Sequence, residues 1–332
     1  MKSMTRRVFP TVSLEAKMLV LLVLGALFPL IFAGRYEQGL GSLILVYVVV
    51  AIGQNIVLGY SGQISIAQSA LMAISAYCSA LLVIKVDVPF PLAALGGLVA
   101  ATTGGALLGL LTFRVRTHYV LLVSIGFHIV VLLLIINLTD ITGGPVGLFP
   151  IPNMNFGSWT LKSPAEHFYV FGVVTVLLFY LAERIRLSRI GLAMFALKNN
   201  ERGARASGVD PIYYRTLAMA LAGFYAGVGG VMFAFLIKFL GPESFSLNSA
   251  LLYILSVVLG GMGNNWGIVV TVVGLTILQE SLKIIAEAWV LLYGLLIMVV
   301  IAVAPGGLPE LVDRFMAWRR DAKPPLQTST PQ

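Results

Sequence analysis

Charged residues are scarce in this chain. Asp, Glu, Lys and Arg make up 11% of its 332 residues, and hydrophobic residues make up 58%. A soluble domain would carry about a quarter charged residues, so this composition excludes an ordinary soluble domain. Several apolar runs reach the roughly 20 residues needed to cross about 30 Å of hydrocarbon. The runs are continuous rather than alternating, which excludes a membrane β-barrel. The expected fold class is an all-α polytopic membrane protein.

Residues that carry chemistry are scarce as well. Cys78 is the single cysteine, which excludes an intrachain disulfide and any multi-cysteine metal site. The sequence has no HExxH motif, no Cys/His cluster and no pair of carboxylates inside an apolar run. It also lacks the GxxxxGK[ST] loop that binds nucleotide phosphates. We therefore expect no catalytic residue, no metal, no cofactor and no enzyme activity. Energy for active transport would have to come from another protein.

His128 is the one ionisable candidate deep inside an apolar run. Membrane enzymes and ion-driven pumps usually place several ionisable groups within their spans. A lone histidine is more often a hydrogen-bond donor to neighbouring helices than a proton relay. The sequence leaves the role of His128 open.

The apolar runs predict about ten transmembrane helices within residues 18–305. Residues 1–17 form a polar head, and residues 306–332 form a polar tail. The first run is interpreted as a retained helix in preference to a cleaved signal peptide, because so many spans follow it. The predicted spans are Met18–Ala33, Leu40–Leu58, Ala67–Ile84, Leu92–Phe113, Tyr119–Leu138, Phe168–Ala182, Thr216–Ile237, Ala250–Met262, Ile268–Leu282 and Ala288–Ala304.

The distribution of charge sets the predicted topology. With ten spans both termini lie on one side, and that side carries 17 of the 22 Lys and Arg residues, whereas the 14 acidic residues divide evenly. A bias in cations alone is what the positive-inside rule describes. We therefore expect cytoplasmic termini, an outer loop over residues 139–167 and a cytoplasmic segment over residues 184–215. Because topology explains the excess of cations, nucleic acid is not an expected partner.

Two stretches interrupt the apolar pattern without carrying charge. GYSGQISI occupies residues 59–66, and LGGMGNNWG occupies residues 259–267. Broken backbone at membrane depth is tolerated where it lines a cavity or is buried in protein, and paired breaks point to a transport site. Short glycine-rich turns are the alternative. Together with a turn in the outer loop, the candidate translocation residues are Ser61, Gly62, Gln63, Ser65, Gln68, Gly143, Gly144, Gly260, Gly261 and Asn264.

The segment over residues 184–215 reads as a helix outside the membrane. Ser188 is suited to cap its start, Gly208 to stop it, and Asp210 with Pro211 to begin the next helix. Such a basic amphipathic helix could lie on anionic membrane lipid. The short-chained and partly acidic stretch over residues 199–203 favours contact with a protein instead.

Five motifs, in order, resemble those of the LivM/LivH-type permeases of branched-chain amino acid ABC importers. KNNERGARASGVD is similar to the cytoplasmic coupling motif of these permeases, although Asn199, Gly203 and Asp210 depart from it. GYSGQISIAQ resembles a second family segment, with Ala67 and Gln68 in place of the usual Gly-His. The remaining similar segments are TGGPVGL, VVLGGMGNNWG and LLYGLLIMVVIAVAPGGL.

The resemblance implies a LivM-like permease in a bacterial inner membrane. Its expected partners are a second, LivH-like permease subunit, two cytoplasmic ATP-binding subunits and a periplasmic substrate-binding protein. The residues expected to contact an ATP-binding subunit are Asn200, Glu201, Arg202, Ala204 and Gly208. The expected substrates are branched-chain or other hydrophobic amino acids, with urea, amides and aromatic acids open. The alternative is a self-sufficient channel or secondary transporter for a small neutral solute.

Overall fold

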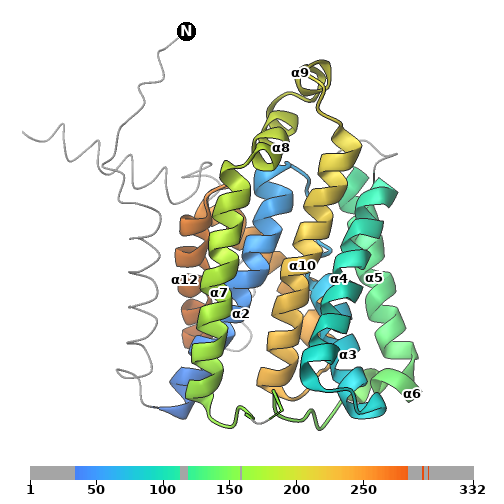
Figure 1. Ribbon diagram of the computed structural model, residues 1–332, viewed down its shortest axis with the longest axis vertical. Helices are drawn as coiled ribbons and strands as arrows, with labels where there is room; N and C mark the ends of the chain where they lie inside the picture. The colour runs from blue at the N-terminus through green and yellow to red at the C-terminus, as the bar shows by residue number, and fades with distance from the viewer. Residues whose placement is uncertain (1–33, 113–118, 158, 283–293, 295–297, 299–332) are drawn as a thin grey trace, which may run out of the picture.

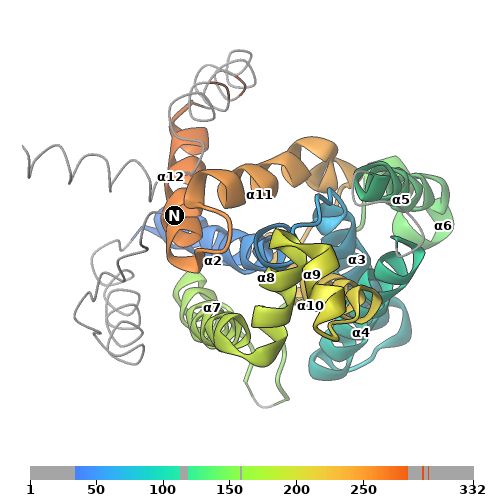
Figure 2. The ribbon, with the colours of Figure 1, turned by 90° about the horizontal axis from the view of Figure 1, so that it is seen from above.

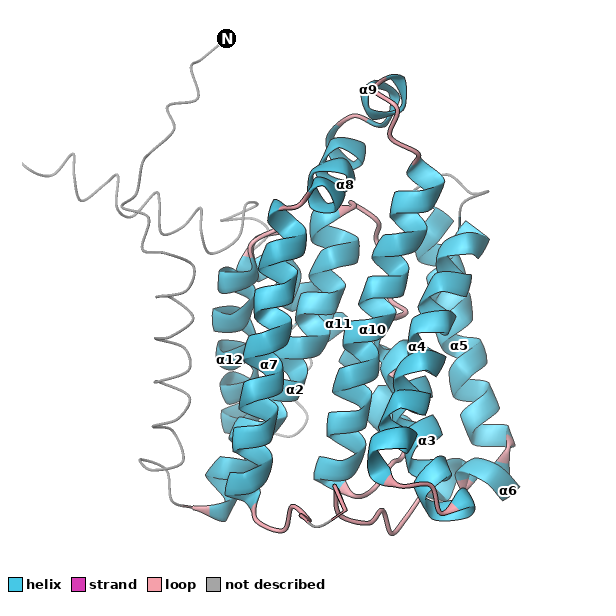
Figure 3. Ribbon diagram, in the orientation of Figure 1, coloured by secondary structure: helices cyan, strands magenta, loops and turns pink. Residues whose placement is uncertain are grey.

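The computed structural model describes residues 34–112, 119–157, 159–282, 294 and 298, and its regular elements are all helices (Figure 3). Within these residues strand pairing is limited to two isolated bridges, Leu148 with Leu240 and Asn155 with Thr160. The elements are α2 (Arg35–Asn55), η1 (Ile56–Tyr60), α3 (Gln68–Val86), α4 (Phe90–Thr112), α5 (Val120–Asn137), α6 (Thr139–Thr142), η3 (Gly144–Val146), α7 (Pro164–Leu187), α8 (Arg189–Asn199), α9 (Glu201–Ala206), α10 (Pro211–Ile237), η4 (Pro242–Phe245), α11 (Leu247–Gly260) and α12 (Asn265–Leu282).

Seven of these helices are long and apolar enough to cross a membrane. The predicted spans Met18–Ala33 and Ala288–Ala304 lie outside the described residues. Every other predicted span lies on a helix of the structure, including the 18-residue α12. An all-helical fold with seven candidate membrane spans is confirmed within the described residues, and the count of about ten stays a prediction.

The bundle has two distinct ends (Figure 1). Helices α8 and α9 cap one end, called here the α9 end, and α6 lies at the opposite end, called the α6 end. Helix α10 packs closely on α2, α3 and α4, and α3 packs on α4 (Figure 2). Small residues permit this approach: a Cβ on Gly223 of α10 would lie 2.5 Å from the Ala101 carbonyl oxygen of α4, and one on Gly230 would lie 2.3 Å from that of Met72.

The first predicted break is a non-helical segment inside the bundle. After Tyr60 at the α9 end, residues 61–67 run back into the interior, and α3 begins only at Gln68. The Gln68 amide donates to the carbonyl oxygens of Val50 and Ala222, each at 3.1 Å. Val50 lies ten residues before Tyr60, which is about 15 Å along a helix. Ser61, Gln63 and Ser65 of this segment are buried, whereas Ile64 is 47% exposed. The broken backbone is thus largely covered by protein at membrane depth, which is one of the settings in which such backbone is tolerated.

A second re-entrant segment enters from the α6 end. Residues 238–246 follow α10, pair with the outer loop through the Leu148–Leu240 bridge, and lead through η4 into α11. Phe245 is fully buried, and η4 packs against α3 and α5. Two re-entrant segments therefore enter the bundle from opposite ends, and the second contains the short 3-10 helix η4.

The second predicted break is instead a tight turn. Residues 261–264 join α11 to α12, with positive φ angles of 88° at Gly261 and 92° at Gly263. A Cβ on Gly260 would meet the backbone nitrogen of Ile268 at 2.6 Å. The glycines permit this turn and a close helix crossing, in agreement with the alternative of a short glycine-rich turn. Whether the turn lines a pathway stays a prediction.

Candidate coupling and translocation site

Two short helices, rather than the expected single one, form the segment at the α9 end. Ser188 caps α8 by accepting a hydrogen bond from the Gly191 amide at 3.4 Å. Asn200 interrupts the helix because its backbone is extended, with φ −154° and ψ 94°, and its side chain caps α9 at the Gly203 amide. Gly208 has φ +83°, and Asp210 caps α10 ahead of Pro211, both as predicted.

The five predicted ATPase-contacting residues differ in exposure. Glu201 pairs with Arg205 at 2.6 Å and with Arg215 of α10 at 2.8 Å. Ala204 is buried, and the Asn200 side chain is used as a helix cap. Arg202 and Gly208 are exposed. Asn200, Glu201 and Ala204 therefore hold α9 in place, and Arg202 and Gly208 belong to its outer surface.

Helix α8 lies directly on η1 and on the start of the first re-entrant segment that follows it. The Lys198 ammonium donates to the Gly59 carbonyl oxygen at 2.8 Å. A Cβ on Gly62 would lie 3.2 Å from that of Lys198. The Phe195 ring contacts the Tyr60 ring, with 5.2 Å between centroids. Burial lowers the pKa of Lys198, because the charged form loses hydration. Helix α8 thus touches the segment through polar, backbone and aromatic contacts.

A buried polar network lies beneath α8. Asn265 of α12 donates to Glu183 of α7 at 3.0 Å and to the Tyr60 hydroxyl at 2.7 Å. Asn55 of α2 donates to Asn265 at 2.7 Å and accepts from the Gly263 amide at 2.9 Å. Four elements, α2, η1, α7 and α12, are joined through side chains at one point.

Glu183 gives this network its charge. Its side chain is 2% exposed and pairs with Arg186, which is 36% exposed, at 2.8 Å. Sequence reasoning missed the network because Glu183 counted only as a loop charge, and Asn55 and Asn265 are uncharged. The available signal for the network was the amide side chain of Asn55 within the predicted apolar span Leu40–Leu58.

The predicted translocation residues separate into three places. Ser61, Gln63, Ser65 and Gln68 are buried in the first re-entrant segment or at the start of α3, and Gly62 lies beneath Lys198. Gly260, Gly261 and Asn264 lie at the α11–α12 turn, where Asn264 accepts from the Trp266 amide. Gly143 and Gly144 lie at the α6 end.

The side chains of Ser61 and Gln63, in the first re-entrant segment, form hydrogen bonds with other residues of this protein. Ser61 donates to the Val57 carbonyl oxygen at 2.7 Å, and the Gln63 amide donates to Ser61 at 2.9 Å and to the Arg215 carbonyl oxygen at 3.2 Å. These bonds tie the re-entrant segment to η1 and to the start of α10. Whether a solute touches these residues stays a prediction.

His128 lies where the two re-entrant segments approach each other. It is fully buried, midway along α5, close to the backbone of Ile66 and Phe245. Neither ring nitrogen makes a hydrogen bond within the described residues. Within the same residues, no group of three or more His, Cys, Asp and Glu could hold a metal ion.

The family comparison agrees with this geometry. Residues 38–301 match the family described as branched-chain amino acid transport system / permease component. The chain belongs to this family. The match covers most of the described helices, including α8, α9 and both re-entrant segments.

Curated relatives are similar over most of the chain. The high-affinity branched-chain amino acid transport system permease proteins LivM of Salmonella typhimurium and Escherichia coli are each 30% identical over 325 residues, covering 90% of this chain and 75% of theirs. The galactofuranose transporter permease protein YtfT of Escherichia coli is 30% identical over 239 residues, covering 69% of this chain and 66% of its own. No solved structure matches. The family and the seven apolar helices make this protein a multi-pass membrane permease.

Proposed function

We propose that this protein is the membrane-spanning permease subunit of an ABC importer for branched-chain or other hydrophobic amino acids in a bacterial inner membrane. The observation that carries the proposal is the seating of α8 on the re-entrant segment, in a chain of this family. The α9 end is then cytoplasmic, in keeping with the basic residues of the 184–215 segment.

Separate subunits supply the energy. The sequence carries no nucleotide phosphate loop, so two ATP-binding subunits work from the cytoplasm, beside a second, LivH-like permease and a periplasmic substrate-binding protein. The exposed surface of α9 and the turn after it fits a cleft on an ATP-binding subunit. The residues of this surface are Arg202, Gly203, Arg205, Ala206, Ser207 and Gly208.

Movement of that surface reaches the membrane interior through a short path. Glu201 fixes α9 to α10 through Arg215, and its bond to Arg205 stabilises the short helix. Helix α8 precedes α9, with the single residue Asn200 between them, and bonds to Gly59 through Lys198. A shift of α9 therefore moves α8 and, with it, the start of the re-entrant segment.

The alternative is a self-sufficient channel or secondary transporter. It would account for the absence of charge in the first re-entrant segment, residues 61–67, and it would give α9 no function. Reconstitution distinguishes the two. The chain alone should pass no leucine, and addition of the partner subunits with ATP should start uptake. Flux through the chain alone would favour the channel.

Charge reversal at Arg202 tests the role of α9. Arg202 is exposed and is not among the contacts that hold α9, so Arg202→Glu should fold normally while weakening the contact with the ATP-binding subunit. We expect ATP-driven leucine uptake to fall at least fivefold at an unchanged amount of membrane-inserted protein. The matched control is Arg184→Glu, an exposed cation on α7. Equal uptake in both variants would remove the α9 surface from the mechanism.

A further inference from the structure

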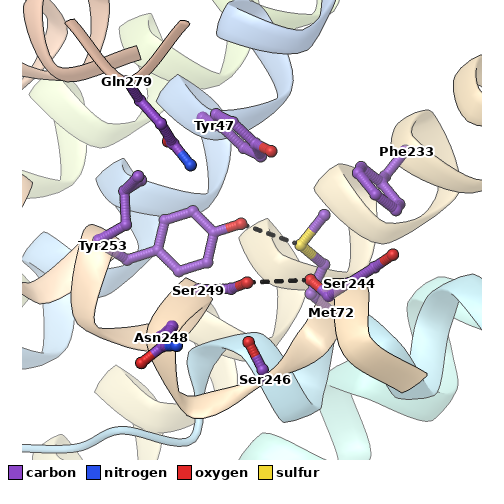
Figure 4. A pocket seen from close by; sticks show the side chains of 10 residues that line it. Tyr47, Met72, Phe233, Ser244, Ser246, Asn248, Ser249, Tyr253 and Gln279 are labelled. Carbon is purple, nitrogen blue, oxygen red and sulfur yellow. Dashed lines mark hydrogen bonds between the residues drawn. The ribbon is translucent and has the colours of Figure 1, made fainter. Parts of the chain in front are cut away.

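A cavity of about 210 Å³ lies beside the second re-entrant segment (Figure 4). That volume is about seven water molecules at roughly 30 Å³ each, which suits one small solute. Its walls come from α2, α3, α10, η4, α11 and α12, so most of the bundle contributes to it.

The cavity lies near the middle of the membrane. Tyr47 of its wall is at the midpoint of the 26-residue span Arg35–Tyr60. Ser244 of its wall directly precedes Phe245, which lies near His128, midway along α5. Polar side chains at this depth are costly unless they face protein or a polar cavity.

The lining has a polar and an apolar part and no charge. Figure 4 shows Ser246, Asn248 and Ser249 around the start of α11, and Gln279 of α12 reaching in from another side. Two tyrosines, Tyr47 and Tyr253, meet edge to face with 6.0 Å between ring centroids. The apolar part is formed by Met72, Phe233 and Leu252.

Few of these polar groups are engaged with one another. The Tyr253 hydroxyl donates to the Met72 sulfur at 3.3 Å, and Ser249 donates to the Ser244 carbonyl oxygen at 3.1 Å. Asn248 is exposed, so the cavity opens at this residue. Hydroxyl and amide groups near an opening at mid-depth can bind the polar end of a solute, and the apolar part can cover its hydrocarbon end.

We infer that this cavity is the halfway binding site for the transported solute, and that it selects a small molecule with one polar and one apolar end, of the class of the aliphatic amino acids. The inference rests on the proposed function and adds the place and the selectivity of binding. A monosaccharide, polar on all sides, matches the apolar part poorly. Without an ion pair the solute is held weakly, which suits a step from which it must leave.

Single-cysteine labelling tests this site directly. In a Cys78→Ser chain, Ser249→Cys places a thiol in the lining, and Asn137→Cys places one on α5, far along the sequence from every lining residue. The assembled transporter is treated with a small, water-soluble methanethiosulfonate reagent, with leucine, galactose or neither. We expect leucine to slow labelling of Ser249→Cys at least threefold, galactose to have no such effect, and neither to change labelling of Asn137→Cys.

The possible results separate the site from the function. Uptake of leucine by the Cys78→Ser transporter tests the proposed function independently. If that transporter takes up leucine while leucine leaves labelling of Ser249→Cys unchanged, the site is wrong and the function stands. Protection by galactose and not by leucine would overturn the assigned solute class. If neither the unmodified transporter nor the Cys78→Ser transporter takes up leucine, the proposed function and the assigned ligand both fail.

Discussion

The buried polar network beneath α8, called here the junction, and the cavity at mid-depth contain different chemical groups. The junction contains a buried glutamate, an ion pair and a chain of side-chain bonds that joins α2, η1, α7 and α12. The cavity is lined by hydroxyl, amide and apolar groups without a charge. A part that transmits force must be rigid, whereas a part that passes a solute must bind it weakly. Substitutions in the junction should therefore impair the whole transport cycle, and substitutions in the cavity should change affinity for the solute.

The largest effect is expected from Asn265→Leu. The change keeps the approximate volume and removes the amide that contacts Asn55, Tyr60 and Glu183. Each buried group left without a partner costs about 1–3 kcal/mol. We expect loss of at least nine-tenths of leucine uptake and a thermal midpoint in detergent lower by several degrees. Asn137→Leu, which removes an exposed amide on α5, is the matched control. Similar leucine uptake and similar thermal midpoints for the two variants would show that the junction contributes to neither transport nor stability.

The smallest effect is expected from Tyr47→Phe in the cavity. Only a hydroxyl is lost, and one hydrogen bond is worth about 0.5–1.5 kcal/mol. We expect the KM for leucine to rise about threefold with little change in maximal rate. Tyr77→Phe removes a buried hydroxyl that donates to Leu240 outside the cavity. It should lower thermal stability and leave KM unchanged, and a rise in KM for the Tyr77 variant alone would argue against the cavity.

Local capping chemistry made part of this architecture predictable from sequence. Ser188, Asp210 and Pro211 lie at helix starts where their side chains or ring geometry favour them. The absence of charge from residue 39 to residue 84 indicated that the segment around Gly62 does not lie in a fully exposed loop, and Ser61, Gln63 and Ser65 are indeed buried. These features depend on neighbouring residues, so a single sequence contains the information.

Long-range packing could not be read in the same way. The LGGMGNNWG motif combines glycines with uncharged polar residues, as the first re-entrant stretch does, yet its Gly260 permits a helix crossing. The second re-entrant segment, residues 238–246, looked like an outer loop, because Lys238 and Glu243 carry charge. The contact of Asn55 with Asn265 joins residues 210 positions apart, and only the packed bundle brings them together.

The most direct test of coupling is a covalent link between α8 and the re-entrant segment. In a Cys78→Ser chain, Gly62→Cys and Lys198→Cys place two thiols close together, since the Cβ atoms would be 3.2 Å apart, near the 3.5–4.5 Å that a disulfide uses. Gly62 has φ +72°, so the Gly62→Cys single variant measures the cost of a side chain at this position. The reduced protein has lost the Lys198 bond to Gly59 and should transport poorly. Oxidation replaces that bond, so uptake should rise, and reductant should reverse the gain. Each single-cysteine variant should be indifferent to oxidation. If the disulfide forms and uptake stays the same or falls, then α8 does not carry the segment with it, and the proposed coupling is wrong.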